Sequence, residues 1–258
     1  MDMQGLVGVA DDPLAIPIDR LYRISPDVYR GMVERGLLTD QDKVVFRDGL
    51  LVQESAGGSE ADPLDGLYRF PLDVYHEMAG LGLLTKYDKA VLLDGLLVKK
   101  MTKGEPHVVA TLLVVDALRG LAGAGWHVRP ESPLTLPSGP SGHGSEPEPD
   151  VYVVRGATRD YLALARHPGP GDLAFVVEVS DSSLRDDRRG LARYAWSRIP
   201  VAWVVNLTNE TVEVYTRPTG PADPARYEET KFYQKGDRLP VVVDGLEVGQ
   251  VAVADLLP

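Results

Sequence analysis

The residues EPDVYVV at 148–154 and FVVEVS at 175–180 decide the fold, because each places one carboxylate on or beside a run of β-branched and aromatic residues. Such runs are typical of buried strands. Burying Asp150 and Glu178 on neighbouring strands costs free energy unless a partner offsets their charge, and a hard divalent cation is the simplest partner. The pair therefore predicts a Mg²⁺-type site. The alternative is that Asp150 caps a turn after Pro149 and Glu178 faces solvent.

The bulk composition is that of an ordinary globular protein. The chain has 258 residues, of which 44% are hydrophobic and 25% are charged, so one large domain or one domain with a small extension is expected. The most apolar stretch, 108–115, is too short to span a bilayer. The acidic residues at 1–12 lack the features of a secretion signal, and cysteine is absent. We therefore expect a cytoplasmic protein without disulfides.

The formal net charge of −11 limits the ways in which this protein can bind nucleic acid. A protein that coats nucleic acid through bulk electrostatics is basic, so that class is excluded. Contact with nucleic acid would instead need a local cluster of Arg or Lys side chains.

An internal repeat with a period of 46 residues occupies the first hundred positions. LYR at 21–23 recurs at 67–69, and DVY at 27–29 recurs at 73–75. GLLT at 36–39 recurs at 82–85, and DGLLV at 48–52 recurs at 94–98. Between residues 21–52 and 67–98, 19 of 32 aligned positions are identical. This identity indicates a duplication.

Each copy is predicted to form one helix followed by a β-hairpin. The helices are expected at 26–35 and 72–81, and an Asp-Gly pair joins the two strands expected at 44–52 and at 90–99. Two copies are too few for a solenoid. We therefore expect the second copy to belong to the main domain, 63–258, and the first to form an added module, 1–62. A spacer rich in Gly, Ser and Asp at 55–65 would join them.

The remaining residues predict a mixed α/β layout. Helices are expected at 107–122 and 186–197, and residues 155–171 are expected to form a surface excursion. Besides the two acidic strands, of which the second spans 173–180, strands are expected at 126–128, 134–136, 201–207, 211–215, 232–234, 241–243 and 248–251.

The order and spacing of these motifs resemble the Uma2 family, also called DUF820, a branch of the PD-(D/E)XK nuclease superfamily. The resemblance covers about residues 68–233 and rests on the succession of its pieces rather than on any one of them. The pieces are Asp94-Gly95 in the second hairpin, His107, EPD at 148–150, RHP at 166–168, VEVSDSSL at 177–184, YA at 194–195 and IPVAWVVN at 199–206. The resemblance implies a restriction-endonuclease-like core, in which helices flank a mixed central sheet.

By that resemblance, Asp150 and Glu178 are catalytic metal ligands, and the backbone carbonyl of Val179 is a third ligand. The implied cofactor is Mg²⁺ or Mn²⁺, which would generate hydroxide from water and offset charge on the transition state of phosphodiester hydrolysis. His107 would open the cleft as an outer ligand or a phosphate contact. Its alternative role is that of an ordinary surface group at a helix N-terminus.

The sequence departs from the family pattern at the lysine that completes the site. In Uma2-like chains this lysine lies on the helix after the second acidic strand, where this chain has Gly190, and no lysine occurs between Lys103 and Lys231. Four arginines stand near that position, namely Arg185, Arg188, Arg189 and Arg193. Their spacing puts several of them on one helical face.

Arg189 is the candidate catalytic cation among these arginines, and Arg188 and Arg193 are possible accessories. Arg stabilises phosphate charge but does not act as a base, because it stays protonated. The alternative is a solvated helix whose arginines are balanced by Asp186 and Asp187.

Two functions therefore stay open. The first is a metal-dependent DNA endonuclease that acts as a homodimer and contacts DNA through the basic helix at 185–193. The second is a catalytically weakened nuclease fold that binds nucleic acid or a protein. A further possibility is that the extra repeat at 1–62 is an oligomerisation element. Serine hydrolases, P-loop enzymes and zinc sites are disfavoured, because the chain lacks a Gly-x-Ser-x-Gly elbow, a Walker motif and His/Cys zinc spacing.

Overall fold

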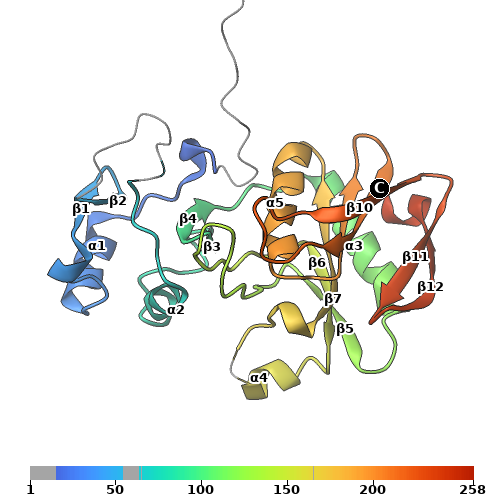
Figure 1. The fold of residues 1–258 in the computed structure, drawn as a ribbon, viewed down its shortest axis with the longest axis horizontal. Coiled ribbons are helices and arrows are strands. Elements are labelled where there is room, and N and C mark those ends of the chain that lie inside the picture. The colour runs from blue at the N-terminus through green and yellow to red at the C-terminus, as the bar shows by residue number, and fades with distance from the viewer. Residues whose placement is uncertain (1–15, 55–63, 65, 165) are drawn as a thin grey trace, which may run out of the picture.

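A computed structural model describes residues 16–54, 64, 66–164 and 166–258, and Figure 1 shows their fold. The α-helices are α1 (Pro26–Glu34), α2 (Leu72–Gly80), α3 (Glu105–Arg119), α4 (Asp160–Leu164) and α5 (Leu184–Trp196). The strands are β1 (Val44–Arg47), β2 (Leu50–Gln53), β3 (Ala90–Leu93), β4 (Leu96–Lys99), β5 (Trp126–Pro130), β6 (Val151–Arg155), β7 (Leu173–Ser180), β8 (Val201–Asn206), β9 (Thr211–Pro218), β10 (Tyr227–Gln234), β11 (Arg238–Val243) and β12 (Leu246–Ala252). Most of the spacer predicted at 55–65 lies outside the described residues.

The centre of the molecule is a six-stranded mixed sheet. Its strand order is β10-β9-β8-β7-β6-β5, in which β7 and β8 are parallel and each other neighbouring pair is antiparallel. The connection between the parallel strands β7 and β8 contains α5, as a crossover of this kind requires. The predicted fold class, a mixed central sheet flanked by helices, is confirmed.

Both faces of the central strands are buried. Because successive side chains of a strand point to opposite faces, each of these strands contributes to both cores. One face, which includes Phe175 and Trp203, packs against α3 and the β11–β12 hairpin. The other face, which includes Tyr152 and Val176, packs against α5. Burial on both sides explains why the central strands read as continuous apolar runs.

Two helix–hairpin units precede the sheet and lie beside it on the left of Figure 1. Unit 1 (residues 21–53) contains α1, β1 and β2, and unit 2 (residues 67–99) contains α2, β3 and β4. In each unit the lysine just before the first strand has a left-handed backbone, with φ of 49° at Lys43 and at Lys89. The residues of each Asp-Gly turn also have a left-handed backbone. The two units share one apolar core, in which Met32 and Met78 are both fully buried.

Several predicted elements have shifted ends, and one predicted strand is absent from the described residues. α3 begins at Glu105 rather than at His107, because Pro106 fits the first helical turn, where its missing N–H costs no helical hydrogen bond. The strand predicted at 134–136 is wrong, since these residues form only an isolated bridge between Leu136 and Ser145. The apolar alternation there reflects burial in a loop rather than a strand in the sheet.

The surface excursion predicted at 155–171 contains α4, which ends at Leu164. None of the helices in the described part of the chain has the length and apolarity needed to cross a membrane.

A buried ion pair ties unit 2 to the central domain. Arg193 on α5 lies with its Nε 2.5 Å from Oδ2 of Asp94, and the side chains are 9% and 3% exposed. The backbone N–H of Asp94 also donates to Oγ of Ser145, at 2.8 Å. The equivalent residue of unit 1, Asp48, is exposed. The Asp-Gly turn of unit 2 is therefore an anchor, whereas that of unit 1 is only a turn.

Asp94→Ala should reduce the free energy of unfolding by about 3–5 kcal/mol more than Asp48→Ala does, because only the first change leaves a buried arginine without its partner. Both positions have a left-handed backbone, with φ of 50° and 48°, so the backbone cost of alanine cancels in the comparison. Urea unfolding of both variants measures the difference. Equal losses would contradict an anchoring role for Asp94.

Candidate active site

The pairing of β6 with β7 brings the two predicted carboxylates together. The strands are antiparallel, with Val151 opposite Val177. Asp150 lies directly before Val151 and Glu178 directly after Val177, so the two carboxylates lie at the same end of this strand pair. The backbone N–H of Asp150 donates to Oε2 of Glu178, at 3.3 Å.

Asp150 is surrounded by donors. Its Oδ2 accepts from the backbone N–H of Val179, at 2.7 Å, and lies 3.2 Å from Nε2 of His107 on α3. Its Oδ1 lies 2.5 Å from Nζ of Lys103. Burial by itself raises the pKa of Asp150, but the hydrogen bond to His107 and the charge of Lys103 outweigh it, so this pKa lies below its usual value. Asp150 is therefore ionised at neutral pH.

Glu178 has the opposite electrostatics. Its Oε1 accepts from the hydroxyl of Tyr194 on α5, at 2.5 Å. Burial, together with the negative charge of Asp150, holds the pKa of Glu178 well above its usual value. The pKa values of the two carboxyls are therefore shifted in opposite directions, with burial the main cause at Glu178 and contacts with His107 and Lys103 the main opposing causes at Asp150.

Lys103 and Asp187 are site residues that the sequence motifs did not identify. Lys103 precedes α3, and its Nζ also lies 2.6 Å from Oε1 of Glu131. Burial lowers the pKa of Lys103, but the charges of Asp150 and Glu131 and the hydrogen bonds to them together outweigh this effect, so the pKa is raised. The pKa of Asp187, on α5, is raised by burial, although its hydrogen bond to Ser183 opposes that shift. The only hint in the sequence was that Lys103 stands four residues before His107.

These groups lie in a cleft of about 700 Å³. Its lining includes Asp150, Glu178 and the α5 residues Asp187, Arg189, Gly190, Arg193 and Tyr194. Residues of unit 2 and the segment that follows it also line the cleft, among them Lys89, Lys99, Lys100 and Lys103. The cleft therefore combines two converging carboxylates with a lysine-rich side.

The arginines predicted on α5 are divided among different partners. Arg188 forms a bidentate pair with the buried Glu213 on β9, with Nε 2.9 Å from Oε2 and Nη2 2.5 Å from Oε1. Arg193 belongs to the ion pair with Asp94. Arg189 lines the cleft. Arg188 and Arg193 thus hold buried carboxylates of other elements, and both Arg189 and Arg193 line the cleft.

Gly190 lies in the same cleft, at the position of the family lysine. A Cβ atom built there would meet no other atom within 4 Å. A side chain at this position would therefore have room to extend into the cleft.

Comparison with known proteins agrees with the sequence motifs. The profile of the Uma2 family, described as "Putative restriction endonuclease", matches residues 73–254. A DUF820 protein from Anabaena variabilis ATCC 29413, whose crystal structure is titled a "putative nuclease", is 15% identical, with a TM-score of 0.48 over 72% of this chain and 97% of that chain. A search of curated proteins gave no match. Because the family profile covers most of the sequence, the resemblance is confirmed and the chain belongs to the Uma2 family.

Proposed function

We propose that this chain is a metal-dependent endonuclease that hydrolyses phosphodiester bonds in DNA. Membership in a family described as a restriction endonuclease supports a nuclease. The observation that carries the proposal is the placement of Asp150 opposite Glu178 in a cleft that also contains Lys103. A pair of carboxylates beside a cation is the arrangement that phosphodiester hydrolysis needs.

Asp150, Glu178 and the carbonyl of Val179 would hold Mg²⁺ or Mn²⁺. The N–H of Val179 donates to Asp150, and the N–H and C=O of one strand residue point to the same side, so its carbonyl faces the same space. Within the described residues no group of three or more His, Asp or Glu side chains has metal-binding geometry. Two carboxylates and a carbonyl suit Mg²⁺, because this ion retains several waters. When bound, such a cation supplies Lewis-acid chemistry toward the phosphodiester and acidifies water.

Lys103 would supply the cation that the family places at the position of Gly190. Its ammonium is a compact charge with three donors, and it already lies at hydrogen-bond distance from Asp150. In the metal-free protein it offsets the charge of Asp150. With a phosphodiester in the cleft, the same ammonium would hold a phosphate oxygen. His107 would orient Asp150 rather than act on the substrate, since its Nε2 contacts that carboxylate.

A weakened, binding-only nuclease fold is the second candidate. The absence of a lysine at Gly190 favours it, as does the engagement of Arg188 and Arg193 in ion pairs. Lys103 favours the active enzyme. Cleavage assays on variants of these positions separate the two.

Glu178→Gln should change the pH dependence of stability of the metal-free protein. Because burial holds the folded-state pKa of Glu178 above its ordinary value of 4.5, the folded protein binds more protons than the unfolded chain between these two values. The free energy of unfolding of the wild type should therefore fall, relative to Glu178→Gln, as the pH rises through that window. Urea unfolding at several pH values measures this difference. Parallel pH profiles would contradict the raised pKa.

The same pair of proteins tests the metal site. Mn²⁺ at 100 times its dissociation constant should stabilise the wild type by about 2.7 kcal/mol, or about 5–10 °C in melting temperature, and should leave Glu178→Gln unchanged. Asp186→Asn is the matched control, since Asp186 lines the same cleft but pairs with Arg20, and this variant should keep the shift. An undiminished shift in Glu178→Gln would exclude Glu178 as a ligand.

Lys103→Met should lower metal-dependent cleavage of plasmid DNA by about 100-fold, because one cationic contact to the reacting phosphate is lost. Gly190→Lys should restore part of that loss in the double variant, by returning an ammonium to the cleft from α5. Cleavage rates at matched metal concentration measure both effects. The double variant Glu178→Gln/Gly190→Lys should remain inactive, and equal cleavage by it would reveal a contaminating nuclease. Unchanged cleavage by Lys103→Met would remove Lys103 from the site.

The lysine-rich side of the cleft should bind DNA. Lys89→Ala/Lys99→Ala should weaken binding and reduce the slope of log affinity against log salt by about one per lysine. Lys43→Ala is the matched control, because Lys43 occupies the equivalent position of unit 1 with the same φ of 49°. Fluorescence anisotropy with a duplex oligonucleotide and no added metal measures the slope. A salt slope that changes only with Arg189→Ala would assign DNA binding to α5 instead.

A further inference from the structure

Units 1 and 2 contact each other through equivalent residues in both directions. Leu21, which precedes α1, forms an antiparallel bridge with Val98 of unit 2. Leu67, which precedes α2, forms an antiparallel bridge with Val52 of unit 1. In the 46-residue repeat, Leu21 is equivalent to Leu67 and Val98 is equivalent to Val52, so the two bridges join equivalent residues. The two bridges are therefore related by an approximate two-fold axis.

The backbone hydrogen bonds follow the same rule. The N–H of Tyr22 donates to the carbonyl of Leu97, at 2.8 Å, and the N–H of Tyr68 donates to the carbonyl of Leu51, at 2.9 Å. The segment that precedes the helix of each unit thus forms a backbone hydrogen bond with the hairpin of the other unit.

The tyrosine hydroxyls extend this reciprocity. The hydroxyl of Tyr22 donates to Asp88. The pKa of Tyr68 is raised by burial and by the charge of Asp42, the equivalent of Asp88 in unit 1. Each entry tyrosine therefore faces the same aspartate of the opposite unit.

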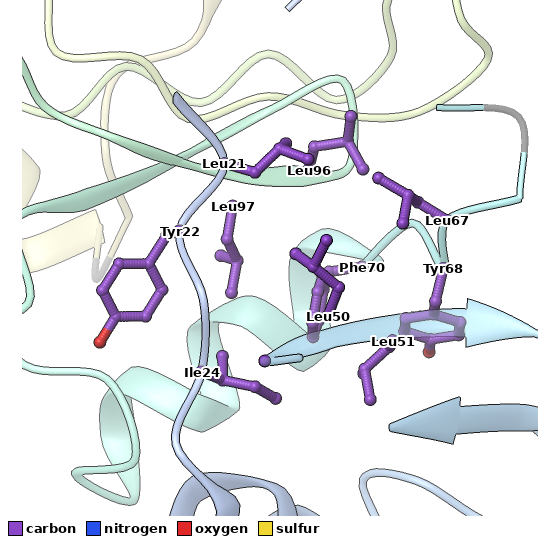
Figure 2. Close-up of a pocket in the computed structure, with 11 residues that line it drawn as sticks. Leu21, Tyr22, Ile24, Leu50, Leu51, Leu67, Tyr68, Phe70, Leu96 and Leu97 are labelled. Atoms are coloured by element: carbon purple, nitrogen blue, oxygen red, sulfur yellow. The ribbon is translucent and has the colours of Figure 1, made fainter. Parts of the chain in front are cut away.

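A small cavity of about 20 Å³ lies at this junction, and Figure 2 shows the side chains around it. Its lining residues, apart from Gly49, form equivalent pairs from the two units: Leu21 and Leu67, Tyr22 and Tyr68, Ile24 and Phe70, Leu50 and Leu96, and Leu51 and Leu97. The cavity is thus lined almost equally by both units, as expected for a space on a two-fold axis. Only Ile24 and Phe70 differ in residue type.

An interface in which residue i contacts residue j and j contacts i is the kind that two identical copies form. The residues that unit 1 places against unit 2 are nearly the same residues that unit 2 itself carries. We propose that unit 2 has a self-association surface, and that unit 1 occupies this surface in place of a second copy of unit 2. The chain is therefore an internal pseudo-dimer at this surface, and the partner that fits the surface is unit 2 of another copy of this chain.

One contact distinguishes unit 1 from unit 2 as a partner. Gly31 of α1 lies against Leu83, and a Cβ atom there would approach Cδ2 of Leu83 to 2.6 Å. Unit 2 has Glu77 at the equivalent position. Because the approached atom is the end of a flexible side chain, pairing of two unit 2 copies needs only a shift of Leu83.

The first test is an exchange within the full chain. Residues 21–52 are replaced by the sequence of residues 67–98, with Gly31 retained. If unit 2 fits itself, this chain should keep the oligomeric state of the wild type and melt cooperatively within about 5 °C of it, a change of one or two kcal/mol. Adding Leu21→Asp to the exchanged chain should lower its melting temperature, because it places a charge in the junction. An exchanged chain without a cooperative melt would refute the proposal.

The second test releases the surface in the full chain. Leu21→Asp/Leu51→Asp should weaken the packing of unit 1 against unit 2. Added to this variant, Leu67→Cys/Val98→Cys tests whether the exposed surface of unit 2 pairs with that of another chain. The chain has no cysteine of its own, so the added pair is unambiguous. Residues 67 and 98 face different partners within one chain, but they would face each other between two copies, at a spacing that a disulfide can span.

Oxidation should therefore give a covalent dimer of the released variant, seen by non-reducing electrophoresis and light scattering. The same cysteine pair without the Leu21→Asp/Leu51→Asp changes should form no disulfide between chains, and Leu67→Cys/Val52→Cys should close an intrachain disulfide. A folded released variant that forms no 67-to-98 cross-link between chains would overturn the proposal. If the released variant does not fold, the cooperative melt of the exchanged chain decides whether the proposal holds.

Discussion

The antiparallel register of β6 and β7 is the constraint on which the cleft depends. It sets Val151 opposite Val177, and Asp150 and Glu178 then lie at the same end of this strand pair. A slip by one residue would move every side chain of β6 to the other face, and the apolar residues that pack on α3 would then exchange with those that pack on α5. The burial of both faces therefore holds the register, and the register holds the carboxylates together.

Bringing two carboxylates together in a buried place has an electrostatic cost, which the surrounding elements offset unequally. Asp150 receives a backbone N–H and faces Lys103 and His107, so it remains charged. Glu178 receives the hydroxyl of Tyr194, and its pKa is raised by burial. The metal proposed for this site would reduce that cost, since binding a cation favours the charged form of both carboxylates.

Helix α5 connects this site to the N-terminal units. Tyr194 contacts Glu178, while the adjacent Arg193 pairs with Asp94 in the hairpin turn of unit 2. The segment that carries Lys103 follows unit 2 directly, so the position of the lysine-rich side depends on how unit 2 sits against α5. Unit 1 in turn covers unit 2 through the reciprocal contacts at Leu21 and Leu67. The architecture of the cleft thus extends from the central sheet through unit 2 to unit 1.

Much of this arrangement was predictable from local sequence. The strand at 173–180, the carboxylates Asp150 and Glu178 and the helix–hairpin pattern of both units follow from apolar runs, Asp-Gly turns and spacing, which are properties of short segments. Family membership followed from the order of motifs. The roles of individual basic residues did not, because an ion pair depends on a partner far away in the chain. Arg193 and Asp94 are separated by 99 residues, and Lys103 and Asp150 by 47. Only the tertiary structure decided which cation faces the carboxylates, because only the packing of unit 2 against α5 and the sheet brings these distant segments within the few ångströms over which a hydrogen-bonded ion pair acts.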